Sequence, residues 1–189
     1  GFSAPVILED SLSDADLLIL LAHDADPFNR WEAGQRLALN RLLAAVKGDG
    51  VLHLDAAYVD AMRAVIHHPA LDAAFKELVL TLPGESYIAE QLQEVDPQRI
   101  HTVRESMRLQ LAHALHDDWE WAYETHHDTG GYSPDPVSAG RRALAGLALA
   151  YLCLAAAEKH APVWPGKAYQ RFKDAGNMTD RLAALSALV

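Results

Sequence analysis

The densest group of histidines in the chain is the first place to look for metal chemistry. The sequence has 189 residues and ten histidines, and the stretch HALHDDWEWAYETHH (113–127) combines imidazole and carboxylate groups at helical spacing. Both kinds of side chain are ligands that zinc and iron accept. On one predicted helical face lie His113, Asp117, Glu120 and Glu124, with His116 beside them.

A structural explanation of this stretch is nevertheless favoured. Metal sites in helical bundles usually draw Glu and Glu-x-x-His motifs from several helices, and only one helix here is rich in such residues. The sequence contains no H-E-x-x-H, Walker A, G-x-G-x-x-G or G-x-S-x-G motif. We therefore interpret 113–124 as a solvated acidic face, and we assign no catalytic, cofactor-binding or metal-binding residue to the chain.

The other histidines and the single cysteine also have structural explanations. His67 and His68 precede a proline and are predicted to close a helix, whereas His126 and His127 are predicted to be exposed in a loop. Cys153 lies in an apolar run, where burial disfavours the thiolate. A lone cysteine cannot form an internal disulfide, which is typical of a reducing compartment.

Two further patterns receive structural interpretations. Trp119, Trp121 and Tyr123 could form an aromatic binding surface, but core packing is the commoner role of aromatic residues on a long helix. The triplet Asn177-Met178-Thr179 fits the N-glycosylation pattern. We interpret it as helix-cap chemistry, with Thr179 as the expected cap.

Charge and hydropathy exclude two classes of partner. The net charge of −10 and the scattered basic residues, of which Arg141-Arg142 is the only adjacent pair, argue against nucleic-acid binding. The most apolar segment, 143–157, would span about 22 Å as a helix, whereas a bilayer core measures about 30 Å. Because Arg142 and Glu158 bracket this segment, we predict a buried helix and no membrane contact. Together with the lone cysteine, this predicts a cytoplasmic location.

Capping residues followed by apolar residues at helical spacing predict an all-α fold. The first three expected helices start at Ser13, Asp26-Pro27 and Asp55, and the next two cover 71–81 and 85–92. A long helix is expected to run unbroken from Asp96-Pro97 to about Thr125. Two more are expected over 137–159 and 166–175, and the last is expected to start at Thr179. Short connections favour antiparallel pairs. We therefore predict an irregular stack of antiparallel helix pairs, a solenoid-like α-superhelix without a strict repeat.

The first and last segments look as if they lack partners. Residues 1–8 (GFSAPVIL) are predicted to be extended, and a lone strand cannot satisfy its own backbone groups. Residues 179–189 begin a helix with a leucine stripe that stops after about three turns. We expect both segments to dock against another copy or to be among the most mobile parts, and 137–159 to be the best buried.

Four stretches, in order, resemble the bacterial aminopeptidase N family, the zinc-dependent alanyl aminopeptidases of the gluzincin class. They are GFSAPV (1–6), SDADLLILLAHDADPFNRWEAGQ (13–35), LTLPGES (80–86) and NMTDRLAALSAL (177–188). The resemblance runs over essentially the whole chain and is weaker around 126–165. It implies that 1–10 end a preceding β-sandwich domain and that 11–189 form the first part of a truncated C-terminal helical domain.

The resemblance also implies the function. The parent would be a zinc metalloaminopeptidase that releases N-terminal amino acids from peptides, and this region would be a non-catalytic wall and cover of the active-site chamber. The family's zinc motif and G-A-M-E-N segment lie upstream and are absent from this sequence. The fragment would need no zinc and be inactive; its partners would be the other domains of the same protein, with peptides as substrates of the parent.

Two alternatives stay open. The first is a free-standing helical scaffold that binds a protein partner through an exposed groove. The second is a metal-binding helical bundle that uses the histidines of 113–127.

Overall fold

Helices are the only regular secondary structure in the computed structural model, which describes residues 11–48, 51–127 and 131–189. This confirms the all-α fold class. The ten helices are α1 (Asp14–His23), α2 (Pro27–Lys47), α3 (Ala56–His67), α4 (Ala73–Leu80), α5 (Glu85–Glu90), α6 (Pro97–Ala114), α7 (His116–His126), α8 (Pro136–Glu158), α9 (Val163–Asp174) and α10 (Met178–Ser186).

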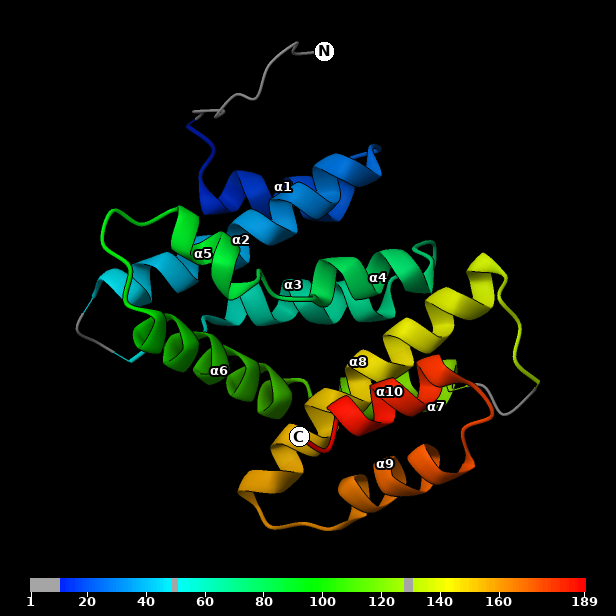
Figure 1. Cartoon of the computed structure of the whole chain (residues 1–189). Helices are drawn as coiled ribbons and strands as arrows, with labels where there is room; N and C mark the ends of the chain where they lie inside the picture. The colour runs from blue at the N-terminus through cyan, green and yellow to red at the C-terminus, as the bar shows by residue number, and fades with distance from the viewer. Residues whose placement is uncertain (1–10, 49–50, 128–130) are drawn as a thin grey trace.

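The helices stack roughly in chain order from one end of the molecule to the other (Figure 1). At the amino-terminal end α1 packs on α2, and α2 contacts α4, α5 and α6. At the other end α8 lies among α4, α6, α7, α9 and α10, and α9 also packs on α10. The result is an irregular layered stack, as predicted.

Local capping explains why most helix starts could be predicted. The side chains of Ser13, Asp26, Asp55 and Asp96 each accept a hydrogen bond from a backbone N–H in the first turn of the helix that follows. At α1 the interaction is reciprocal, because the Asp16 carboxylate also accepts from the Ser13 backbone N–H, at 2.8 Å. Such caps satisfy amide groups that have no partner within the helix.

Helix α8 is the best-buried helix, as predicted, with eleven of its 23 residues buried. Among the described residues it is also the one helix that is long and apolar enough to cross a membrane, although 61% of its most apolar window is covered by the rest of the fold. Such coverage is typical of a core helix. Cys153 on α8 is buried, and burial raises the pKa of its thiol to about 11, which disfavours the thiolate.

The helix predicted over 96–125 is in fact two helices, α6 and α7, separated by the buried Leu115 (φ −117°, ψ 24°). The indole N–H of Trp119 donates to a carbonyl in the last turn of α6, at 3.1 Å. The guanidinium of Arg63, from α3, donates to the carbonyl of Ala114 at 3.3 Å. Side chains thus satisfy carbonyls next to the break, which is a common reason for a sharp kink.

The aromatic residues of α7 divide between the core and the surface. Trp119 is buried and stacks on Tyr151 of α8, with ring centroids 4.4 Å apart, and Tyr123 is also buried. Trp121 is exposed and lies against His67, with ring centroids 4.4 Å apart. Core packing therefore accounts for two of the three aromatic residues singled out in the sequence.

The last two helices begin earlier than predicted. Helix α9 starts at Val163, and α10 is capped by Asn177 instead of Thr179, because the Asn177 side chain accepts from the backbone N–H of Asp180 at 2.9 Å. This confirms cap chemistry for the Asn177 triplet. The leucine stripe of α10 is exposed, with Leu182 at 58%. Residues 1–8, predicted to be extended, lie outside the described residues.

Candidate functional site

The break at Leu115 separates the residues predicted to share one acidic face. His113 lies in the last turn of α6 and pairs through Nε2 with the carboxylate of Glu158 on α8. Glu124, near the end of α7, lies 3.0 Å from Nζ of Lys167 on α9. Both residues therefore belong to contacts between helices.

The remaining part of the predicted cluster does not fit a zinc site. His116, Asp117 and Glu120 have ligand atoms within 4.8 Å of one another, all from the first turns of α7, and both carboxylates are exposed. Structural zinc is held by four ligands in a closed tetrahedron, and catalytic zinc usually lies in a dry, shaped cavity. An exposed group of three ligands from one helix meets neither requirement, so we keep the interpretation of a solvated acidic face.

His67 ends α3, as predicted, and its Nε2 lies 2.8 Å from Oδ1 of Asp118 on α7. The prediction that His126 is exposed in a loop is wrong. His126 is the last residue of α7, is 8% exposed, and its Nδ1 lies 2.8 Å from the carbonyl oxygen of Ala122. Burial lowers the pKa of His126, and the positive charges of Lys76 and Arg141 lower it further. The hydrogen bond to the carbonyl of Ala122 acts in the opposite direction.

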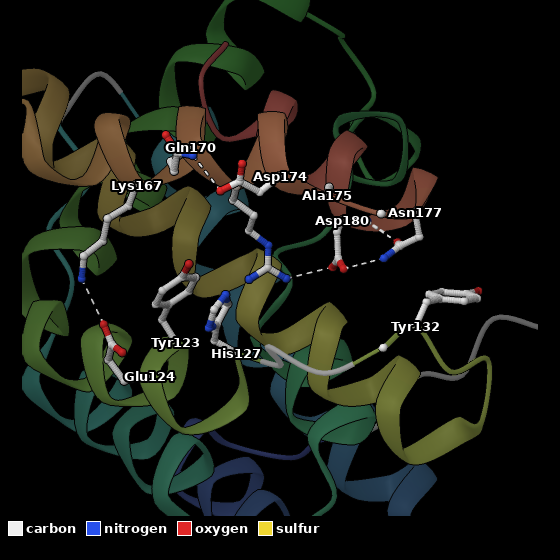
Figure 2. A pocket seen from close by; sticks show the side chains of 13 residues that line it. Tyr123, Glu124, His127, Tyr132, Lys167, Gln170, Asp174, Ala175, Asn177 and Asp180 are labelled. Atoms are coloured by element: carbon white, nitrogen blue, oxygen red, sulfur yellow. Dashed lines mark hydrogen bonds and ion pairs between the residues drawn. The ribbon is translucent and has the colours of Figure 1, made fainter.

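A cavity of about 830 Å³ lies between α7, α9 and the start of α10 (Figure 2). Its size is in the range of pockets that hold small molecules. The side chains around it are mainly polar, charged or aromatic, and they come from segments more than fifty residues apart in the chain. They include Tyr123, Tyr132, Lys167, Arg171, Asn177 and Asp180.

An ion pair at this cavity ties α9 to α10. Nη2 of Arg171 donates to Oδ1 of Asp180 at 2.8 Å, and Nδ2 of Asn177 donates to Oδ2 of the same carboxylate at 2.7 Å. Figure 2 shows Asp180 joined to Asn177 by a dashed line. Burial opposes ionisation of Asp180, but the hydrogen bonds from Asn177 and Arg171, and the charges of Arg171 and Arg142, hold its pKa below the ordinary value.

A second guanidinium group lies beside this ion pair. Arg142, on α8, is only 6% exposed, and its guanidinium carbon is 4.7 Å from the centroid of the Tyr132 ring. Neither Nε of Arg142 nor Nη1 of Arg171 has a hydrogen-bond partner in the described part of the chain. Sequence reasoning noted Arg142 as half of a basic pair and as one end of the apolar segment 143–157, and it missed this site, whose other members become neighbours through folding.

Two other cavities among the described residues show less unusual chemistry. In the larger, of about 1,020 Å³, the guanidinium of Arg99 donates to the carbonyls of Ala45 and Gly48 and so helps to close α2. The smaller, of about 220 Å³, lies beside Tyr151. The cavity between α7, α9 and α10 is therefore the candidate site.

Comparison with known proteins supports the resemblance noted in the sequence. Residues 14–189 match a family described as a domain of unknown function (DUF3458_C) with ARM repeats. Aminopeptidase N of Caulobacter vibrioides is 34% identical over 189 residues, and aminopeptidase N of Escherichia coli is 36% identical over 192 residues. Each alignment covers 100% of this chain and 21% of the relative, so the chain spans about a fifth of the length of these relatives.

A solved structure agrees with the fold over nearly the whole chain. The crystal structure of Legionella pneumophila aminopeptidase A in complex with aspartic acid superposes with a TM-score of 0.82 at 25% sequence identity. The match covers 98% of this chain and 22% of that protein.

Proposed function

Because this chain belongs to the DUF3458_C family and is homologous over its whole length to the C-terminal helical region of bacterial aminopeptidase N, we propose that it acts as a wall of a zinc aminopeptidase. In this role it covers the active-site chamber and restricts entry to small peptides. The observation that carries the proposal is the match of the whole helical stack to one fifth of much larger aminopeptidases.

Two physical properties support the wall function. First, α8 is buried among five other helices, so the stack can hold a fixed surface against the rest of an enzyme. Second, the net charge of −10 favours the approach of a cationic peptide amino terminus through long-range attraction. Both properties concern access to the chamber and require no catalytic group on this chain.

In the proposed enzyme, a zinc ion held by other segments would activate the water that attacks the first peptide bond. The sequence has no H-E-x-x-H motif, and the three clustered ligands on α7 do not fit a zinc site. We therefore place the zinc chemistry on other segments of the enzyme. The contribution of this chain is to shape the chamber and limit its entrance.

The proposal can be tested by transplantation. Residues 1–189 would replace the homologous region of E. coli aminopeptidase N, with a deletion of that region as the control. We expect the chimera to hydrolyse alanyl-p-nitroanilide and to discriminate against long peptides, and the deletion variant to lose activity or this discrimination. A folded chimera that treats short and long peptides like the deletion variant would contradict the proposal.

The isolated chain provides a second test. We expect no hydrolysis of alanyl-p-nitroanilide, with or without added zinc, since the sequence has no H-E-x-x-H motif and the ligand group found among the described residues does not fit catalytic zinc. Zinc-dependent turnover by the isolated chain would contradict a non-catalytic role.

A helical scaffold that binds a protein partner is the second candidate. The exposed leucines at the end of the chain favour it, because Leu182 and Leu185 on α10 and Leu188 just after it offer an apolar contact surface. If the stripe packs inside the chimera, hydrogen exchange of α10 will slow relative to the isolated chain, which supports the wall function. Unchanged exchange would favour the scaffold.

A further inference from the structure

The small cavity between α6, α8 and the connection from α4 to α5 is lined by a buried hydroxyl group that the fold leaves unpaired. The cavity measures about 220 Å³, and Tyr151 of α8 lines it. Tyr151 is 3% exposed, and its hydroxyl makes no hydrogen bond within the described part of the chain. The hydroxyl is nevertheless not sealed, because the fully buried, unpaired side-chain atoms of that part belong to Arg142 and Arg171. The Tyr151 hydroxyl therefore opens into the cavity.

The position of this hydroxyl is fixed by packing. The Tyr151 ring stacks on Trp119 with 6° between the ring planes, and the Trp119 indole donates to the carbonyl of Leu111 at 3.1 Å. The ring therefore cannot turn away to find another partner. Burial raises the pKa of Tyr151 to about 12, against the opposing charges of Arg108 and Arg104. The hydroxyl thus stays protonated at neutral pH and can donate a hydrogen bond.

Two guanidinium groups line the same cavity. Arg104 and Arg108 lie one turn apart on α6, with side chains 21% and 31% exposed. Nε of Arg104 donates to the carbonyl of Pro83 at 2.9 Å. Nη1 of Arg108 donates to both carboxylate oxygens of Glu105, at 3.0 and 2.8 Å. Nη2 of each arginine has no hydrogen-bond partner among the described residues and is not sealed from solvent, so both groups are available to a ligand.

Water in the cavity could satisfy a lone hydroxyl, but the charges beside it favour an anion. The charged groups that act on the Tyr151 hydroxyl are Arg108, Arg104 and Glu105, and two positive charges with one negative charge leave one positive charge. Close by, Glu77 accepts a hydrogen bond at 3.0 Å from the hydroxyl of Thr81, which lines the cavity. The negative charge of Glu77 opposes a dianion such as phosphate.

Shape and size narrow the ligand further. A carboxylate is planar, carries one negative charge and matches the N–H groups of a guanidinium. The volume of about 220 Å³ equals roughly seven water molecules at ~30 Å³ each, and is smaller than the pockets that hold drug-sized ligands. Leu82 and Leu147 also line the cavity, and they offer an apolar contact to a short carbon chain.

We propose that the cavity lined by Arg104, Arg108 and Tyr151 is a binding site for a carboxylate group on a small aliphatic body. The carboxylate oxygens accept hydrogen bonds from the two guanidinium groups and from the Tyr151 hydroxyl. The carboxylate belongs either to a free small acid or to an acidic side chain of another polypeptide segment. This proposal does not depend on the wall function, since it rests on groups within the chain.

Matched probes test the proposal by nuclear magnetic resonance titration of the ¹⁵N-labelled full 189-residue chain. Acetate and acetamide have the same shape and differ in charge, so we expect acetate to bind at least about tenfold more tightly. Sodium chloride keeps the ionic strength constant and occupies any site that accepts every small anion. We expect acetate to shift the amide signals around Arg104 and Tyr151. Equal affinities for acetate and acetamide, shifts confined to other residues, or tighter binding of inorganic phosphate than of acetate would overturn the proposal.

A second pair of probes identifies the source of the carboxylate. N-acetyl-glutamic acid α-amide carries the side-chain carboxylate of a polypeptide, and N-acetyl-glutamine α-amide is its neutral counterpart. If the glutamic acid probe binds more tightly than acetate and the glutamine probe does not, the site takes an acidic side chain. If acetate binds as tightly or more tightly, the site takes a free acid.

A tyrosine variant distinguishes a ligand site from a structural role. We expect Tyr151→Phe to weaken acetate binding by about tenfold without lowering the thermal midpoint, because the hydroxyl loses a bond to the ligand and none to the described part of the fold. Tyr123→Phe is the matched control, since it removes a hydroxyl from another buried tyrosine, which lines the cavity between α7, α9 and α10. Acetate affinity of this control should stay within about twofold of the wild type. Wild-type affinity of a folded Tyr151→Phe variant would contradict the proposal.

Charge variants of opposite sign keep the test decisive if Tyr151→Phe does not fold. Arg108→Gln should weaken acetate binding by about tenfold, whereas Glu105→Gln removes the counter-charge and should strengthen it several times. Arg141→Gln is the control for a lost positive charge, since Arg141 donates to the carbonyl of Thr125 and does not line this cavity. Unchanged or weaker acetate binding by a folded Glu105→Gln variant would contradict the proposed electrostatics.

Discussion

The crossing of α4 and α8 depends on the absence of a side chain at Gly140. A Cβ atom at Gly140 would lie 2.8 Å from the backbone nitrogen and 2.9 Å from the Cβ of Ala74 on α4. Non-bonded atoms of these kinds do not approach so closely, and a backbone atom cannot rotate away as a side chain can. Gly140→Ala must therefore shift one helix relative to the other.

Two other helical glycines provide a graded control. A Cβ at Gly146, also on α8, would lie 3.3 Å from the Cβ of Ala183, and a Cβ at Gly166 on α9 would meet no atom within 4 Å. Alanine is favoured over glycine in a helix by roughly 0.8–1 kcal/mol at each position. Overpacking costs about 1–3 kcal/mol, and this cost should apply in full only at Gly140.

The three variants should therefore differ in sign. We expect Gly166→Ala to stabilise the chain by about 0.5–1 kcal/mol, Gly146→Ala to be close to neutral, and Gly140→Ala to destabilise it by up to about 2 kcal/mol. For a chain of this length each kcal/mol moves the thermal midpoint by about 2–4 °C. Urea unfolding followed by far-ultraviolet circular dichroism measures the differences. A Gly140→Ala variant as stable as Gly166→Ala would refute the close approach of α4 and α8.

Three further predictions concern the cap of α10, the buried histidine and the acidic face of α7. Asn177→Ala should lower the free energy of unfolding by about 1 kcal/mol and Thr179→Ala by much less, since Asn177 is the cap; equal losses in urea unfolding would contradict this. His126 has a lowered pKa in the folded state, so its contribution to stability is present above its ordinary pKa of 6.5 and is lost as the pH falls through the folded value. His126→Gln should therefore flatten the loss of stability on acidification below pH 6.5, and an unchanged profile of thermal midpoint against pH would count against it. We expect elemental analysis after dialysis to find no stoichiometric zinc, whereas one zinc per chain that is lost in Glu120→Ala would support a metal site at this exposed cluster.

Most of the helices that could be predicted were recognisable from capping residues close to their first turns. Helix starts such as Ser13 and Asp55 could be recognised because a capping side chain bonds to the backbone within three residues of itself. The break at Leu115 could not be recognised, because no proline or glycine marks it. The side chains that contact the backbone at the break include Arg63, which donates to the carbonyl of Ala114, 51 residues away in the chain.

The candidate site was outside the reach of sequence patterns for a similar reason. Arg142, Arg171 and Asp180 lie on three helices, and no spacing rule relates them. The residues predicted to share one acidic face are divided between two helices, because a helix that breaks at Leu115 no longer keeps His113 in register with Glu120. The expectations for 1–8 concern residues outside the described part of the chain and stay predictions.

The central position of α8 has a consequence for how the domain unfolds. In repeat arrays each unit contacts only its neighbours, so such arrays can lose structure progressively from one end. Here α8 contacts both α4, which precedes it by more than fifty residues, and α10, which follows it. Opening of α8 therefore removes the packing of five helices at once, and these helices form one cooperative unit. Helix α1 packs on α2 and α3 at the other end, so its amides can exchange while that unit stays closed.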